Sequence, residues 1–208
     1  MLVPAIFMNF AIVGLNQIYD RKIDQINKPY LPVASGELSV DSALLFVAFS
    51  IMAAFIWGCL SGSIPLMFTL LVSLMLGVLY SVDHKLLRWK RYPLLAAACI
   101  VLVRAFTVHI GFFLHARLQQ SGVLAPESVV STLATVVLIM SIYSIVIALF
   151  KDLPDISGDK LHGINTVSVR FGVPYTFRIC FVLLLLAHFW YVFKIVNDPT
   201  CFDPTVVV

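Results

Sequence analysis

Long apolar stretches alternate with short polar segments along almost the whole chain. Each of the long stretches reaches the roughly 20 residues that a helix needs to cross a bilayer. Their residues are apolar on every side, whereas the strands of a membrane barrel alternate apolar and polar positions. The pattern therefore predicts an all-α, multi-pass transmembrane helical bundle, with spans at 1–19, 42–60, 64–82, 92–116, 128–150 and 173–196.

The composition agrees with a membrane protein. The chain is 61% hydrophobic and 12% charged, whereas a soluble domain carries roughly 25% charged residues. No repeat or long linker divides it, so we expect one intramembrane domain at 1–196 and a short non-helical tail at 197–208, where prolines disfavour a helix. Four cysteines without CxxC spacing indicate neither a disulfide framework nor a zinc site. The expected surroundings are the lipid bilayer and not nucleic acid.

Basic residues are concentrated on one side of the predicted spans. Because consecutive spans alternate in direction, the loops 20–41, 83–91 and 151–172 share one face, and these loops hold most of the 14 lysines and arginines. The positive-inside rule places such a face in the cytosol or its organellar equivalent.

Acidic residues gather where two of the spans end. The first cluster is Asn16-Gln-Ile-Tyr-Asp-Arg-Lys-Ile-Asp24, and the second is Lys151-Asp-Leu-Pro-Asp-Ile-Ser-Gly-Asp159. Four predicted helices separate the clusters, so both lie at the same membrane face. Carboxylates near hydrocarbon are expensive and usually functional. A lone pair of this kind is more often a solvated helix end, but that explanation would have to hold twice on one face.

The first cluster has the spacing of a metal site. Asn16, Asp20 and Asp24 stand at i, i+4 and i+8, so they project along one stripe of a helix. Like charges at i and i+4 repel each other, and a cation would relieve that repulsion. Carboxylate and amide oxygens are hard ligands that suit Mg²⁺ better than zinc.

The second cluster has a less regular setting. Pro154 disfavours helical geometry at the residue before it, so we expect a frayed helix end at which Asp152, Asp155 and Asp159 converge locally. Two metal-carboxylate clusters that face each other would hold a diphosphate and stabilise it as a leaving group. Further cationic donors to such an anion are Lys28, Lys90, Arg91, Lys151 and Lys160.

Two further polar residues lie near these clusters or within a span. Arg104 is in the middle of the span 92–116, on the same helical face as His115. The pair could orient an acidic or phenolic ligand, or could form a structural contact between helices. Tyr80 ends a span at the motif face, where it is either an interfacial anchor or a contact to diphosphate or an aromatic ring.

The two clusters and their flanking residues resemble the motif regions of UbiA-type intramembrane prenyltransferases. The segment Asn27-Lys-Pro-Tyr-Leu-Pro-Val-Ala-Ser-Gly-Glu37 follows the first cluster, and His162-Gly-Ile164 follows the second. The form is most similar to the plant plastid branch that acts on homogentisate, which also contains flavonoid and other phenolic prenyltransferases. The resemblance covers nearly all of residues 1–196.

The resemblance implies a Mg²⁺-dependent transfer of a prenyl group, phytyl or geranylgeranyl, from a prenyl diphosphate to an aromatic acceptor in a plastid membrane. With homogentisate the product belongs to tocopherol-type biosynthesis, and prenylation is accompanied by loss of CO₂. The family fold has nine transmembrane helices, of which this chain resembles the second to the seventh. We therefore expect about six of the nine here.

The resemblance also implies roles for individual residues. The metal and diphosphate residues carry over to Asn16, Asp20, Asp24, Asp152, Asp155 and Asp159, with Asp20, Asp24, Asp152 and Asp155 as the catalytic carboxylates. The expected substrate-binding residues are Lys28, Tyr80, Arg91, Arg104, Lys151 and Lys160.

Other functions remain as alternatives. A CDP-alcohol phosphotransferase also uses Mg²⁺ and aspartates at a membrane surface, but its linked Asp-Gly and Ala-Arg signature does not occur around the clusters. A transporter or channel would be expected to show internal repeats and broken helices at the midplane, which are not evident here. A catalytically inactive truncated isoform that binds full-length partners is the remaining alternative.

Overall fold

The structure is a computed structural model that describes residues 1–84, 86–120 and 127–197. Within these ranges it is entirely helical, and six helices are long and apolar enough to cross a membrane. This confirms the predicted multi-pass bundle. The spanning helices are α1 (Leu2–Asn27), α3 (Val40–Leu60), α4 (Ile64–Ser81), the run of α5 (Pro93–Val101), η2 (Leu102–Thr107) and α6 (Val108–Gln120), α7 (Glu127–Lys151) and α10 (Val173–Asn197).

The first helix continues well past its expected end at residue 19. It reaches Asn27, and the Lys28 amide caps it by donating to the Asp24 carbonyl at 2.7 Å. No proline or glycine occurs between Gly14 and Pro29, so nothing in the sequence interrupts the helix earlier. The first acidic cluster is therefore part of a transmembrane helix and not of a loop. At the other end of the chain, α10 includes Asn197, and the rest of the expected tail lies outside the described residues.

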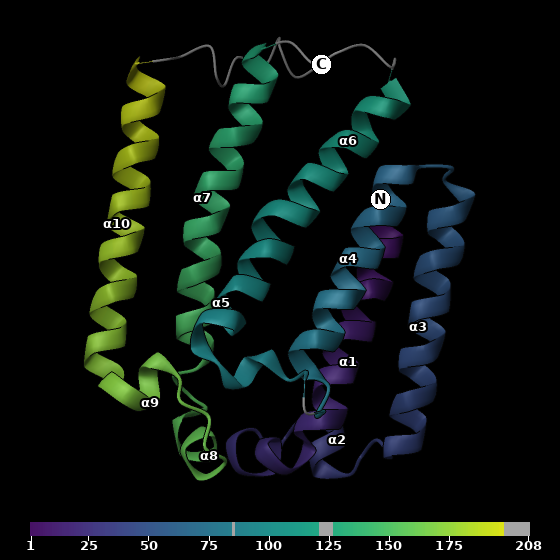
Figure 1. Cartoon of the computed structure of the whole chain (residues 1–208), viewed down its shortest axis with the longest axis vertical. Coiled ribbons are helices and arrows are strands. Elements are labelled where there is room, and N and C mark those ends of the chain that lie inside the picture. Colours follow the sequence, from purple (N-terminus) through teal and green to yellow (C-terminus); the bar gives the residue numbers. More distant parts are fainter. Residues whose placement is uncertain (85, 121–126, 198–208) are drawn as a thin grey trace.

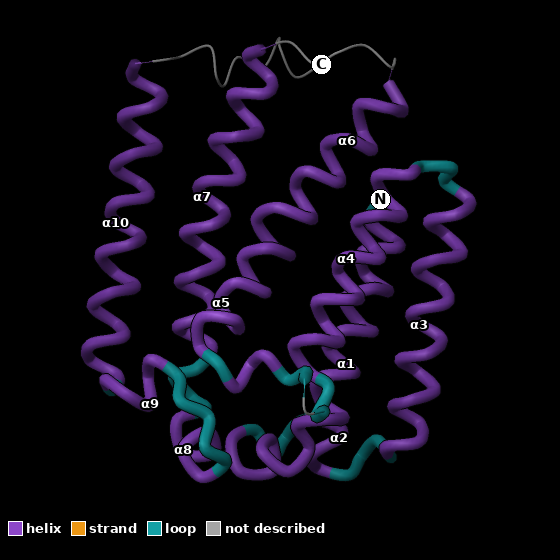
Figure 2. Tube along the Cα trace, in the orientation of Figure 1, coloured by secondary structure: helices purple, strands orange, loops and turns teal. Residues whose placement is uncertain are grey.

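The remaining helical segments are short and lie together at one end of the bundle. They are α2 (Pro32–Ser35), the 3₁₀ turn η1 (Trp89–Arg91), α8 (Ile156–Leu161) and α9 (Val167–Phe171). Figure 2 shows that most of the loops gather at this end as well. We call it the motif face, because α1 ends there and α7 turns into α8 there (Figure 1).

Small residues allow the helices around α4 to approach closely. A Cβ added to Gly77 on α4 would lie 2.9 Å from Ile12 on α1. A Cβ added to Gly111 on α6 would lie only 1.7 Å from the Thr69 hydroxyl on α4. Such contacts are a common way for helices to associate in lipid, where burial of apolar surface drives association only weakly. They hold α1, α4 and α6 around a common space.

The fourth spanning segment is not a regular α-helix. Residues Leu102–Thr107 form a π-helical turn, a feature that is frequently found at functional sites. The ring nitrogen Nδ1 of His109 lies 2.7 Å from the carbonyl oxygen of Arg104, and this hydrogen bond occupies a carbonyl in the irregular turn. His109 thus supports the backbone around Arg104.

Candidate functional site

The first motif forms the expected stripe on α1. Asn16 donates through Nδ2 to Asp20 Oδ2 at 2.8 Å and to the Ser81 hydroxyl on α4 at 3.5 Å. The side chains of Asp20 and Asp24 are buried. The stripe therefore faces inward, toward α4 and the segments of the motif face.

Cations from the segment between α4 and α5 surround Asp20. Lys90 forms an ion pair with Asp20 Oδ2, and Arg88 Nη2 lies 3.6 Å from Asp20 Oδ1. Burial lowers the pKa of Lys90, although the neighbouring Asp20 favours its charged form. Arg91, a predicted substrate contact, pairs with Asp83 at 3.1 Å and is half exposed. The cations closest to the first motif are thus Arg88 and Lys90, which lie in the same loop as Arg91.

The second motif sits at a break between helices, as Pro154 predicts. α7 ends at Lys151 and α8 begins at Ile156. Lys151 Nζ donates to the Tyr80 hydroxyl at 2.8 Å and lies 3.5 Å from Asp152 Oδ1. The hydroxyl of Tyr80, a predicted substrate contact, thus touches the lysine that begins the second motif.

The two motifs are joined directly by the last residues of α1. Lys28 Nζ pairs with Asp155 Oδ2 at 2.7 Å. Asn27 donates to the Asp155 carbonyl at 3.1 Å and accepts from the Gly158 amide at 2.8 Å. A Cβ on Gly158 would lie 2.5 Å from Asn27 Oδ1, so the contact requires glycine there. We call this contact the Asn27 clamp.

The negative charges of the second motif's carboxylates repel one another. Burial raises the pKa of Asp152. Burial, together with the negative charges of Asp152 and Asp155, raises the pKa of Asp159 to about 6. The site therefore gains from any additional positive charge that enters it.

The donor set fits a hard divalent cation. Within the described ranges, no three His, Cys, Asp or Glu side chains form a ready metal-binding group, so Asp152, Asp155 and Asp159 do not converge as closely as the sequence suggested. However, Asp20 Oδ1 and Asp155 Oδ1 are buried without a hydrogen-bond partner, and each is available to a ligand. Mg²⁺ typically takes one or two carboxylates together with substrate phosphates, and this arrangement offers such a set.

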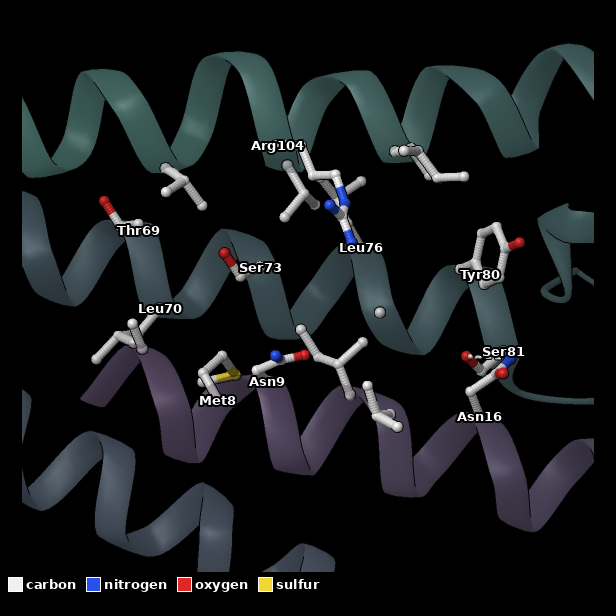
Figure 3. A pocket seen from close by; sticks show the side chains of 18 of the residues that line it. Met8, Asn9, Asn16, Thr69, Leu70, Ser73, Leu76, Tyr80, Ser81 and Arg104 are labelled. Atoms are coloured by element: carbon white, nitrogen blue, oxygen red, sulfur yellow. Dashed lines mark hydrogen bonds between the residues drawn. The ribbon is translucent and has the colours of Figure 1, made fainter. Parts of the chain in front are cut away.

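A cavity of about 490 Å³ opens beside the motifs, between α1, α4, the α5–η2–α6 run and α7. Its end near the motif face is lined by Asn16, Tyr80, Ser81 and Lys151, and its inner end by apolar residues such as Met8 and Leu70 (Figure 3). The volume falls in the range of roughly 300–1,000 Å³ that small-molecule sites occupy. The cavity can therefore hold a molecule with a polar head and an apolar body.

The structure separates two residues that the sequence placed on one face. Arg104 lines the cavity, but His115 is buried and is not among its lining residues. The reason is the π-helical turn, which adds a residue to the helical repeat and so changes the register beyond it. Lys160, an expected substrate contact, is exposed on α8. Beside it, the ring nitrogen Nδ1 of His162 lies 2.8 Å from the carbonyl oxygen of Gly158.

Sequence reasoning missed several polar residues of the site. Arg88 next to Asp20 was counted only as a loop cation. Asn9 and Ser73 line the inner cavity and face it from α1 and α4 (Figure 3). Their signal in the sequence was faint, because single small polar residues in a span are common, and only the packing of α1 against α4 brings these two together.

The fold and the site together define a multi-pass membrane protein with two acidic motifs at the mouth of an intramembrane cavity. The chain belongs to the UbiA prenyltransferase family, whose profile matches residues 1–204. This confirms the resemblance seen in the motifs.

Individual relatives agree with that assignment. The chain is 49% identical over 188 residues to homogentisate phytyltransferase 1 of Arabidopsis thaliana, and 46% identical over 187 residues to homogentisate geranylgeranyltransferase of Triticum aestivum. It is 42% identical over 187 residues to naringenin 8-dimethylallyltransferase 2 of Sophora flavescens. Each alignment covers 90% of this chain but 45–47% of the relative, so the chain spans about half the length of the curated relatives it matches.

A solved structure has the same fold. A UbiA homolog from Archaeoglobus fulgidus, bound to GPP and Mg²⁺, superimposes with a TM-score of 0.64 at 17% sequence identity. The match covers 99% of this chain and 70% of that one.

Proposed function

We propose that this chain transfers a prenyl group from a prenyl diphosphate to a ring carbon of an aromatic acceptor, with Mg²⁺ as the metal. The observation that carries the proposal is that both acidic motifs meet at one membrane face, through Lys28 and the Asn27 clamp, beside a cavity with a polar mouth and a mostly apolar interior. Membership of the UbiA prenyltransferase family supports the reaction class.

The metal would be held by the oxygen ligands of the two motifs, which are Asn16, Asp20, Asp24, Asp152, Asp155 and Asp159. When bound there, Mg²⁺ would neutralise the diphosphate and favour its departure. The chain itself provides further positive charge around the same anion, with Lys90 and Arg88 beside the first motif and Lys28 and Lys151 beside the second. Charge-assisted hydrogen bonds from these side chains would orient the diphosphate at the mouth.

The cavity would then control what happens at the allylic carbon. The carbon–oxygen bond breaks with its electron pair on the diphosphate, and the apolar walls keep water away from the electron-deficient carbon. The Tyr80 ring already lies near a cation, with Lys151 Nζ 5.4 Å from its centroid, and an aromatic ring so placed favours positive charge. The acceptor ring carbon forms the new bond and then loses its proton. With homogentisate, CO₂ also leaves from the carboxymethyl side chain, whose methylene carbon takes up a proton.

Homogentisate is the acceptor, and phytyl or geranylgeranyl diphosphate the donor, that we propose first. The support is that the four plant relatives named for homogentisate are 44–49% identical, whereas the plant relatives named for naringenin and glycinol are 42% and 37% identical. A homogentisate phytyltransferase of Synechocystis is more distant, at 38% identity. A flavonoid or other phenolic acceptor is the second candidate. Several relatives are named chloroplastic, which supports a plastid membrane as the location.

The test uses membranes that contain this chain, supplied with radiolabelled geranylgeranyl or phytyl diphosphate and homogentisate. We expect a prenylated product in Mg²⁺ and none in EDTA. Because the chain spans about half the length of its relatives, a second preparation joins it to the remaining helices of a homogentisate prenyltransferase. Absence of product from both preparations, with homogentisate and with flavonoids, would contradict the proposal.

A further inference from the structure

Arg104 is an arginine in the middle of a membrane span with no anionic partner. It lies near the centre of the 26-residue span Pro93–Leu118 and lines the cavity, where Figure 3 shows it directed toward Leu76 on α4. In the described part of the chain, its guanidinium has no hydrogen bond or ion pair. Among the cavity-lining residues there is also no aspartate or glutamate.

An unpaired guanidinium at this depth requires an explanation. Arginines inside membranes face a cavity or pair with another group, because isolation in hydrocarbon is costly. Near the centre of its span, Arg104 is about 15 Å from either headgroup region, and an arginine side chain cannot extend that far to solvate itself. The cavity, which Arg104 lines, is thus a place from which an anionic partner can reach it.

The backbone around Arg104 is built to hold this side chain in place. The π-helical turn changes the register of its helix, and His109 occupies the carbonyl of Arg104 at 2.7 Å. Close packing of Gly111 against Thr69 holds the following helix against α4. These contacts fix the backbone position from which the Arg104 side chain enters the cavity, and a recognition site benefits from such a supported position.

The other cation that lines the cavity is already occupied. Lys151, at the mouth, contacts both Tyr80 and Asp152. The cavity therefore has two positive positions with different settings, one within the motifs that would hold the diphosphate and one deeper and free of acidic neighbours. Asn9 and Ser73 line the same inner part and offer hydrogen bonds to hydroxyl groups.

We propose that Arg104 binds the carboxylate of the acceptor and makes the site selective for a hydroxylated aromatic acid over a neutral phenol. This rests on the proposed prenyl transfer and names the class of its acceptor. A guanidinium and a carboxylate form a bidentate, charge-assisted pair. A site built around such a pair rejects an acceptor that lacks the carboxylate, because its own charge is then left unpaired.

The experiment compares homogentisate with 2-methylhydroquinone, which has the same ring hydroxyls but a methyl group in place of the carboxymethyl group. Arg104→Gln is expected to lower kcat/KM for homogentisate by about 100-fold and to change kcat/KM for 2-methylhydroquinone by less than about 3-fold. Arg104→Lys should fall between Arg104→Gln and the original chain, since lysine keeps the charge but not the bidentate geometry. Arg178→Gln is the matched control, because it removes an arginine from another span that does not line the cavity.

Binding measurements separate this inference from the proposed reaction. Saturable binding of radiolabelled homogentisate should be weakened in Arg104→Gln, whereas binding of prenyl diphosphate in Mg²⁺ should be unchanged and shows that the variant is folded. Equal loss of both acceptors, or loss of prenyl diphosphate binding, would overturn the role of Arg104. If neither the original chain nor the preparation extended by the remaining helices makes product, the proposed reaction fails. The homogentisate binding comparison then still decides the inference, because no saturable binding to the original chain would overturn it.

Discussion

The two acidic motifs perform similar electrostatic tasks with different backbones. The first occupies one stripe of a continuous transmembrane helix, α1, and its carboxylates are buried. The second lies where α7 gives way to the short helix α8, and its carboxylates are spread over a turn and a helix. The first motif is therefore placed by regular helical geometry, whereas the second depends on side-chain contacts for its position.

The contacts that position the second motif come from the end of α1, the helix that contains the first motif. Lys28 and Asn27, which follow Asp24 on the chain, hold Asp155 and the start of α8. The geometry of α1 alone therefore places the first motif, whereas the second motif is held in position by its contacts with the end of α1. Variants should thus affect the two motifs unequally, and the following predictions test this in order of decreasing effect.

The largest effect should come from removing one carboxylate of either motif. We expect Asp20→Asn and Asp152→Asn each to lower prenyl transfer by at least about 10³-fold, because loss of a metal ligand removes several kcal/mol of charge stabilisation. The measurement is single-turnover product formation over a range of Mg²⁺ concentrations. Asp41→Asn, an exposed aspartate in the first turn of α3 at the same face, is the control. Unchanged Mg²⁺ dependence in both motif variants would contradict the shared metal site.

The Asn27 clamp should matter next, and only for the second motif. Gly158→Ala places a Cβ 2.5 Å from Asn27 Oδ1, and such overpacking costs roughly 1–3 kcal/mol. We expect about 10-fold weaker binding of prenyl diphosphate, with α8 more rapidly cleaved by protease.

The neighbouring Ser157→Ala, on the exposed side of the same helix, should behave like the original chain. Adding Asn27→Ala to Gly158→Ala should weaken prenyl diphosphate binding little further, since the two changes break the same contact. Additive losses would indicate that the two residues act separately.

Substitutions of the two lysine and arginine neighbours Lys90 and Arg91 should change KM for the prenyl diphosphate to different extents. Lys90 is buried against Asp20, whereas Arg91 is half exposed on Asp83. Lys90→Gln should raise KM for the prenyl diphosphate by about 5-fold, because it removes the nearest positive charge from a buried carboxylate. Arg91→Gln should change KM by less than about 2-fold, as exposed ion pairs contribute little. The reverse ranking would restore Arg91 as the substrate contact that the sequence suggested.

The smallest effect should be a pH dependence of stability in the metal-free protein. The pKa of Asp159 is raised from 3.8 to about 6, so between these values the folded state binds a proton that the unfolded state has released. The free energy of unfolding therefore decreases as the pH rises from about 4 to 6. Asp159→Asn should reduce this decrease, whereas Asp41→Asn should leave it unchanged. Thermal unfolding in EDTA across this pH range is the measurement, and an identical pH dependence in all three proteins would exclude Asp159 as a source.

Much of this architecture could be predicted from local sequence. The apolar stretches predict the six spans, because length and hydropathy act on each segment separately. The i, i+4, i+8 spacing predicts the stripe of Asn16, Asp20 and Asp24, since it needs only a regular helix. Alternation of the spans predicts that both motifs lie at one face. Each of these conclusions depends on residues that are near one another in the chain or on simple parity.

The tertiary structure alone decided which side chains meet. The choice of Lys90 over Arg91 as the partner of Asp20 depends on a turn in which Arg88 adopts a left-handed conformation. The joining of the motifs depends on Asn27 reaching Gly158, 131 positions away in the chain. The separation of Arg104 from His115 depends on a π-helical turn that ideal periodicity does not contain. These contacts follow from how distant segments pack, and the free energy that selects them is shared among many residues, so no single local pattern reveals them.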